Sequence, residues 1–144
     1  IYDRPANRFV AGFLGSPAMN FIPGRLRREN GAMRFMAESV DVLLPALADG
    51  GINSGRSALA DGLPIELGIR PEDIDMGDAS NARIAGIVDV VEPLGDELVV
   101  YARVAAQTVV AKHPPHVAVR AGDTVHLKPR ADKVHLFDAS GAVI

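Results

Sequence analysis

A glycine-rich stretch near the middle of the chain comes closest to a motif for nucleotide chemistry. Residues 50–57 (GGINSGRS) have the spacing of a phosphate loop, with arginine where the motif has lysine. A phosphate loop needs a buried strand before it and a helix after it, because backbone N–H groups at that junction cradle the phosphates. Residues 45–49 are not strand-like, and residues 57–62 are too short for the helix. We therefore interpret the stretch as a loop, and an enzymatic function would rest on this motif alone.

Carboxylates and imidazoles elsewhere do not follow a metal-binding or catalytic spacing. Residues 73–78 (DIDMGD) resemble the start of a calcium loop, but Ile84 occupies the twelfth position, where a glutamate is required. A zinc site usually needs three or four converging ligands. We interpret 73–78 as a solvated acidic turn and the histidines as structural or surface residues: His113, His116, His126 and His135. The sequence thus predicts no catalytic residue, no metal ligand and no cofactor-binding residue.

The composition narrows the class of protein further. The chain has 144 residues, of which 48% are hydrophobic, and this is enough to form one domain with a hydrophobic core. It contains no cysteine, which excludes disulfide bonds and thiolate chemistry. No apolar run approaches the roughly 18–20 residues that cross a bilayer. Because the chain begins with isoleucine rather than methionine, we expect it to be a piece of a longer protein.

Charge is unevenly distributed along the chain. Residues 1–34 carry a net +4, residues 35–99 carry −10, and residues 100–144 carry +3. The acidic middle and an aromatic content of 5% argue against a nucleic-acid partner, because such surfaces are basic and often use aromatic stacking. One basic cluster falls on a predicted hairpin, where we interpret it as a solvated strand edge: Arg25, Arg27, Arg28 and Arg34.

The hydrophobic pattern changes period after the first twenty residues. An apolar stripe at helical spacing predicts one amphipathic helix near the start: Ala6, Phe9, Val10, Phe13 and Leu14. Beyond it, period-two alternation and turn residues predict eight or nine short strands, beginning with a hairpin around Asn30-Gly31. A long loop is predicted over 46–62 and a short helical turn at 71–73. The predicted fold class is all-β, a barrel or sandwich preceded by one amphipathic helix.

Four stretches resemble a known protein family. Residues 1–21 (IYDRPANRFVAGFLGSPAMNF) resemble the junction that closes the nucleotide-binding domain in ATP-binding subunits of carbohydrate-type ABC importers, those of the maltose, glycerol-3-phosphate and multiple-sugar systems. Residues 67–74 (LGIRPEDI) resemble the Gly-Ile-Arg-Pro-Glu motif of their C-terminal regulatory domain. Residues 90–97 (VVEPLGDE) and 136–138 (LFD) resemble its following hairpin and last strand.

This resemblance implies an OB-type β-barrel of the TOBE kind and a regulatory and dimerisation role. Residues 1–20 would be the terminal helix and linker of a missing nucleotide-binding domain, and residues 21–144 the barrel. The expected partners are a second copy of the subunit, its nucleotide-binding domain, the permease subunits indirectly, and in some relatives a regulatory protein. ATP and Mg²⁺ would bind the missing domain, so this fragment would be no enzyme, although its parent would be a transport ATPase. The intact transporter would place it in the cytoplasm, peripheral on the inner face of the membrane.

The resemblance also suggests residues at a domain or subunit interface: Phe9, Phe13, Phe21, Arg70, Pro71 and Glu72. The stripe that includes Phe9 and Phe13 would be exposed without the missing domain, so we expect the fragment to self-associate through that helix or swap it. The alternative function is a barrel that binds a small oxyanion or sugar. Convergence of Arg70, Arg83 or Arg103 on one pocket would favour this alternative.

Overall fold

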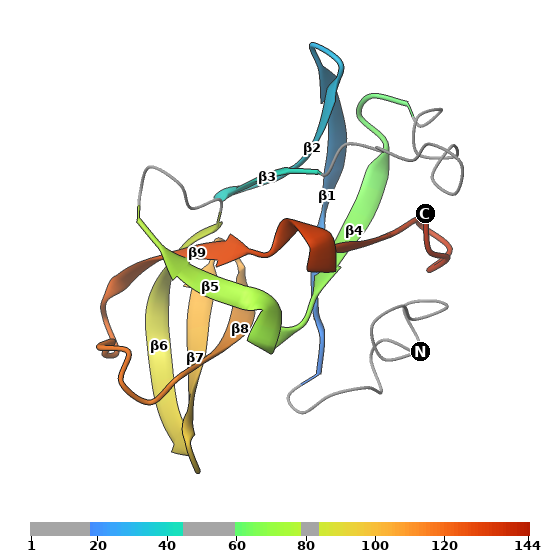
Figure 1. Cartoon of the computed structure of the whole chain (residues 1–144). Helices are drawn as coiled ribbons and strands as arrows, with labels where there is room; N and C mark the ends of the chain where they lie inside the picture. Colours follow the sequence, from blue (N-terminus) through green and yellow to red (C-terminus); the bar gives the residue numbers. More distant parts are fainter. Residues whose placement is uncertain (1–17, 45–59, 79–83) are drawn as a thin grey trace.

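The computed structural model describes residues 18–44, 60–78 and 84–144, and in these ranges the chain is almost entirely β-structure (Figure 1). Two single 3-10 turns, η1 (Pro71–Asp73) and η2 (Ala131–Lys133), interrupt the strands. The strands in chain order are β1 (Asn20–Glu29), β2 (Ala32–Ala37), β3 (Val40–Leu43), β4 (Pro64–Ile69), β5 (Ile74–Gly77), β6 (Ile84–Leu94), β7 (Glu97–Val104), β8 (Gln107–His113), β9 (Thr124–Pro129) and β10 (His135–Phe137).

The strands form the same arrangement twice. In the first half, β1 pairs with β2 and β4, and β2 pairs with β3, all antiparallel. In the second half, β6 pairs with β7 and β9, and β7 pairs with β8, again antiparallel. The remaining strands are exchanged, because β5 leaves the first half to pair with β9, and β10 returns to pair with β4. We call β1–β4 with β10 the first lobe, and β6–β9 with β5 the second lobe (Figure 1).

The register of the two halves shows that the repeat extends to individual residues. Ile22 and Gly24 of β1 lie opposite Leu67 and Ile65, while Ile84 and Gly86 of β6 lie opposite Leu127 and Val125. In each half the same pattern continues two residues later, where Leu26 faces Phe35 and Val88 faces Ala102. Arg70 before η1 likewise corresponds to Arg130 before η2. The chain therefore contains two structurally similar repeats whose equivalent residues lie about sixty positions apart.

One hydrophobic core serves both lobes. Its buried cluster contains residues of the first lobe, such as Phe35 and Leu67, together with residues of the second, such as Val100 and Leu127. The lobes also join directly, since Val40 of β3 pairs with Ile84 of β6. The exchanged β5 also lies against β8 and thereby helps to close the second lobe. Burial of this shared apolar surface is the main stabilising term for the fold.

The predicted all-β class and strand positions are confirmed, with one strand missed. Asn30 and Gly31 have φ values of 53° and 79°, as the predicted tight turn between β1 and β2 requires. The prediction of a solvated acidic turn over 73–78 was wrong, because residues 74–77 form β5. Ile74 is buried and pairs with Pro129, so burial of alternate side chains outweighed the acidic local composition. The predicted helix around residues 6–14 and most of the predicted loop over 46–62 lie outside the described residues.

Candidate docking surfaces

The β1–β2 hairpin carries a cluster of exposed or half-buried arginines, which we call the arginine hairpin: Arg25, Arg27, Arg28 and Arg34. The strand pleat sets their arrangement, because Arg27 faces Arg34 across the pair while Arg25 lies two residues before it on the same face. Leu26 between them points the other way and is buried. The hairpin therefore presents basic side chains outside and an apolar anchor inside.

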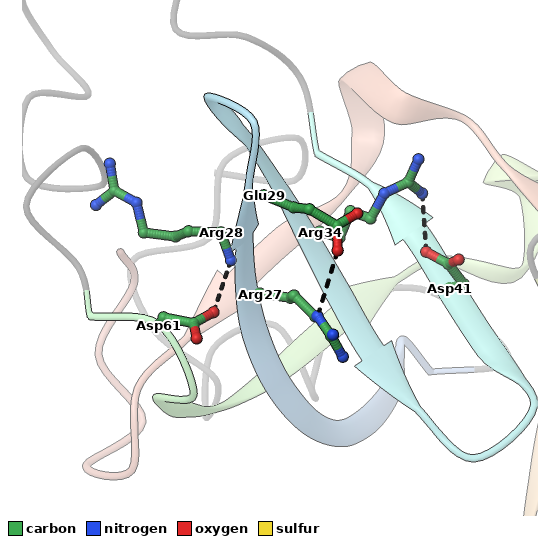
Figure 2. Close-up of polar contacts among 6 residues, drawn as sticks. All are labelled: Arg27, Arg28, Glu29, Arg34, Asp41 and Asp61. Atoms are coloured by element: carbon green, nitrogen blue, oxygen red, sulfur yellow. Dashed lines mark hydrogen bonds and ion pairs between the residues drawn. The ribbon is translucent and has the colours of Figure 1, made fainter.

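Acidic neighbours pair with part of this cluster (Figure 2). The Arg34 guanidinium lies 2.9 Å from the Asp41 carboxylate, and Arg27 lies 3.7 Å from Glu29. The backbone N–H of Arg28 donates to Asp61 at 2.8 Å, which attaches the hairpin to the segment before β4. These ion pairs are solvent-exposed or partly so, and such pairs contribute little to stability. Their side chains can therefore exchange partners at small cost.

The equivalent β6–β7 hairpin of the second lobe has a different surface, which we call the apolar–acidic hairpin. Ile87, Val90 and Leu94 of β6 are each about half exposed, at 54%, 52% and 50%. A bulge between Val88 and Val90 shifts the register of the strand. The same hairpin carries four carboxylates: Asp89, Glu92, Asp96 and Glu97. Period-two alternation predicted this strand but not its exposed stripe. The only local sign of the stripe was that Val90 and Leu94 flank Glu92 on one face of β6.

Weak polar contacts order the acidic side chains. Arg103 lies 3.2 Å from Asp89, and Lys112 lies 3.3 Å from Glu97. The Tyr101 hydroxyl donates to Glu92 at 3.3 Å. Partial burial and then the Glu92 charge raise the pKa of Tyr101. Three of the four carboxylates therefore have a polar partner, while the apolar stripe beside them remains exposed.

A buried asparagine joins the start of β1 to the second lobe. The Asn20 amide nitrogen donates to the backbone oxygens of Val110 (2.8 Å) and Ile69 (3.1 Å), and the Val110 N–H donates back to the Asn20 side-chain oxygen at 2.8 Å. The Gln107 amide adds a hydrogen bond to the Phe21 oxygen at 3.0 Å. The amide groups thus occupy the free edge of β8, which otherwise pairs only with β7. No local pattern predicted this contact, because its two partners are ninety residues apart in the chain.

The predicted interface residues near this joint come together in the structure. Phe21 and Arg70 lie at the same end of two paired strands, because Asn20 pairs with Ile69. Phe21 is half-buried and packs edge-on against Phe137, with ring centroids 5.7 Å apart. Arg70 and Pro71 are buried, and Glu72 is half-buried. The interface role of these residues stays a prediction, and Phe9 and Phe13 lie outside the described residues.

Comparison with known domain families accounts for both halves of the chain. The family model of the MalK OB-fold domain matches residues 15–74, and that of the TOBE domain matches residues 67–137. The chain belongs to this family of TOBE and MalK-type OB-fold domains. The two matches overlap only where β4 and η1 lead into the exchanged β5.

Relatives of this TOBE domain are ATP-binding subunits of ABC transporters. An uncharacterised ABC transporter ATP-binding protein of Sinorhizobium fredii is 43% identical over 96% of the chain. The α-glucoside transport ATP-binding protein AglK of Rhizobium meliloti is 34% identical over 98%, and the sn-glycerol-3-phosphate import ATP-binding protein UgpC of Ralstonia nicotianae is 34% identical over 96%. The chain spans only 34%, 38% and 37% of these three proteins.

A solved structure with the same fold is the cytoplasmic molybdate-binding protein ModG, in its molybdate-bound form. It superposes with a TM-score of 0.59 and 16% identity, covering 81% of this chain and 94% of ModG. At this identity the likeness shows the fold alone. The predicted OB-type architecture of the TOBE domain is thereby supported by both sequence and shape.

The arginines named for a ligand site do not line a cavity beside β1 and β4 in the described part of the TOBE domain. Arg70 is buried, Arg103 is exposed and pairs with Asp89, and Arg83 lies outside the described residues. The cavity measures about 480 Å³ and lies between the β1–β4 pair and the turn at 138–141, where Glu66 and Asp138 supply carboxylates. Ser140 donates to Asp138 and is the main cause of its lowered pKa. This lining favours a cation or hydroxyl groups over an oxyanion.

The histidines occupy separate environments in the TOBE domain. His113 ends β8 and is buried, and its Nε2 has no hydrogen-bond partner among the described residues. Burial lowers the pKa of His113, against a smaller opposing effect of Asp75. His116 is exposed, while His126 and His135 are half-buried on β9 and β10. Across the described ranges, no three metal-ligating side chains form a cluster, and no helix is long and apolar enough to cross a bilayer.

Proposed function

We propose that this chain is the C-terminal regulatory part of an ATP-binding subunit in an importer of sugars or related small solutes. In this role it holds two such subunits together while their nucleotide-binding domains open and close. This proposal is supported mainly by relatives that match nearly the whole chain. AglK is named as a transport ATP-binding protein and UgpC as an import ATP-binding protein, and both are about three times as long as this chain. The ATP and Mg²⁺ sites then belong to the rest of the subunit, and the domain lies at the cytoplasmic face of the membrane.

The surface of the domain supports a role in protein contact. Its described residues present two differently charged hairpins and a shared core with few buried polar groups, which suits a rigid docking module better than an active site. Permease subunits would be reached through the nucleotide-binding domain, and a regulatory protein could use a surface left exposed in the dimer.

Two measurements on the 144-residue chain test this proposal. Sedimentation velocity over a wide concentration range is expected to show a reversible monomer–dimer equilibrium, and a monomer at every concentration would contradict the dimerisation role. Thermal unfolding with and without ATP and Mg²⁺ is expected to give the same Tm, because a ligand raises Tm only by binding the folded state. A nucleotide-dependent rise would instead favour a nucleotide site in residues 50–57.

Small-ligand binding remains the second candidate, supported by the shared fold with ModG, whose described structure holds molybdate. Titration calorimetry with molybdate, phosphate and sugars separates the two functions. Heat that saturates at one ligand per chain would favour the binding function. Its absence for all three, together with dimerisation, would favour the regulatory one.

A further inference from the structure

We propose that two copies of this chain associate by placing the arginine hairpin of one copy against the apolar–acidic hairpin of the other. The inference rests on the proposed function only in requiring that copies associate. It goes beyond that function by naming the two surfaces that meet and the chemistry that matches them.

The two structurally equivalent hairpins carry opposite net charges. Residues 25–36 carry a net +3, while the equivalent residues 87–103 carry a net −3. The strand pairings that frame these segments are equivalent, because β1–β2 repeats as β6–β7. Complementary patches of this kind steer association and fix its register.

Apolar side chains accompany the charges on both surfaces. Three of the five large hydrophobic residues exposed in the described ranges lie on β6, at Ile87, Val90 and Leu94. On the first lobe, Leu43 is 45% exposed and lies directly across from Arg34. An apolar centre with a charged rim is the usual composition of a protein interface, and arginine stems can cover apolar side chains while their heads reach carboxylates.

The arrangement of the lobes makes the contact intermolecular. The tips of the β1–β2 and β6–β7 hairpins lie at opposite ends of the molecule (Figure 1), so one chain cannot bring them together. A second copy turned end for end could form both contacts at once and close as a twofold dimer. This is why a second copy, rather than an unrelated partner, is the occupant that the surfaces favour.

Charge reversal on each hairpin gives a direct test. One variant, Arg25→Glu with Arg27→Glu, carries two acidic hairpins, and a second, Glu92→Arg with Asp96→Arg, carries two basic ones. We expect each variant alone to associate at least about tenfold more weakly than the wild type. An equimolar mixture of the two is expected to form a heterodimer, because every contact in it is again between opposite charges.

The control is Lys128→Glu, which reverses an exposed charge on β9 outside both hairpins and is expected to leave association unchanged. Sedimentation velocity measures association, and circular dichroism with Tm confirms that each variant folds. If the wild type dimerises but the hairpin variants associate equally well, the inference is overturned while the proposed function stands. The same holds if only removal of residues 1–16 abolishes the dimer. A wild type that never associates contradicts both.

Discussion

The two lobes share their strand pairings and differ in what they expose. Both place an Ile-x-Gly-x-aliphatic pattern on the inner face of the first strand, at Ile22 to Leu26 and at Ile84 to Val88. The outer faces of the same strands carry arginines in one lobe and apolar or acidic side chains in the other. Selection on folding constrains the inside, whereas the outside is free to diverge. The two lobes therefore differ most in the chemistry of their outer faces.

The lobes also fill equivalent core positions differently. Phe35 of the first lobe corresponds to Ala102 of the second, and Ala37 corresponds to Val104. A Cβ added to Gly24 would lie 2.4 Å from the Phe35 ring, so glycine leaves room for that large side chain. In the second lobe, a Cβ on Gly86 would instead meet a Val104 methyl at 2.9 Å. In the first lobe the large Phe35 is followed two residues later by the small Ala37, and in the second lobe the small Ala102 is followed by the larger Val104. The difference in volume at one position is thus offset at the other.

Removing the largest of these side chains tests whether the lobes form one folding unit. Phe35→Ala is expected to lower the free energy of unfolding by about 3–5 kcal/mol, because the side chain is fully buried. Since the core is shared, the second lobe should unfold at the same lowered urea concentration. Tyr101 fluorescence reports that lobe in a Tyr2→Phe background, while circular dichroism reports the whole fold.

A matched control for Phe35→Ala is Val143→Ala, which truncates an exposed apolar side chain outside both hairpins. It should change stability by no more than about 0.5 kcal/mol. If the urea midpoint measured by Tyr101 fluorescence is the same in the Phe35 variant as in the wild type, the lobes unfold independently. That result would contradict a shared core.

The two joints between the lobes provide a second comparison. At one, β3 meets β6 through the backbone, with the Ala85 N–H donating to the Ser39 oxygen at 3.0 Å. At the other, the Asn20 side chain replaces a backbone partner for β8. Asn20→Ala is expected to cost about 1–3 kcal/mol, because it leaves buried backbone groups without their partners. Denaturant unfolding measures the loss, and faster hydrogen exchange of the Val110 N–H would locate it.

Gln107→Ala is the matched control at the same joint, because it removes one amide hydrogen bond from a partly buried position. Its expected cost is about 0.5–1.5 kcal/mol. Equal losses for the two variants would show that Asn20 acts only as another surface amide and does not close the edge of β8.

Local patterns in the sequence predicted most strands, because alternation and turn residues are short-range signals. The turn at Asn30-Gly31 and the limits of β4 and β7 followed from them directly. The missed β5 is only four residues long and has acidic neighbours, so its strand character depends on pairing with β9, more than fifty residues away. The repeat itself was readable from the spacing of the Ile-x-Gly patterns, but its strand exchange was not.

The candidate surfaces also combine features that local sequence patterns predicted with features that depend on the whole fold. The arginine cluster was visible in the sequence, although it was interpreted only as a solvated edge. The opposing stripe on β6 was not, because exposure of Ile87, Val90 and Leu94 depends on what the rest of the fold leaves uncovered. Arg70 was named on family resemblance, and its burial follows from packing that no local pattern encodes.

The smallest predicted effect concerns pH and is confined to the second lobe. Burial lowers the pKa of His113 below the unfolded value of 6.5, so the folded state favours the neutral imidazole. Its stabilising contribution is therefore complete above about pH 6.5 and is lost as pH falls through the folded pKa, by at most about 1.4 kcal/mol at pH 5.5. His113→Leu should remove this part of the acid sensitivity, whereas His116→Gln, at an exposed position, should retain it. Urea unfolding of the three proteins at both pH values measures the difference, and an equal acid loss in all three would show that protonation of His113 is not its cause.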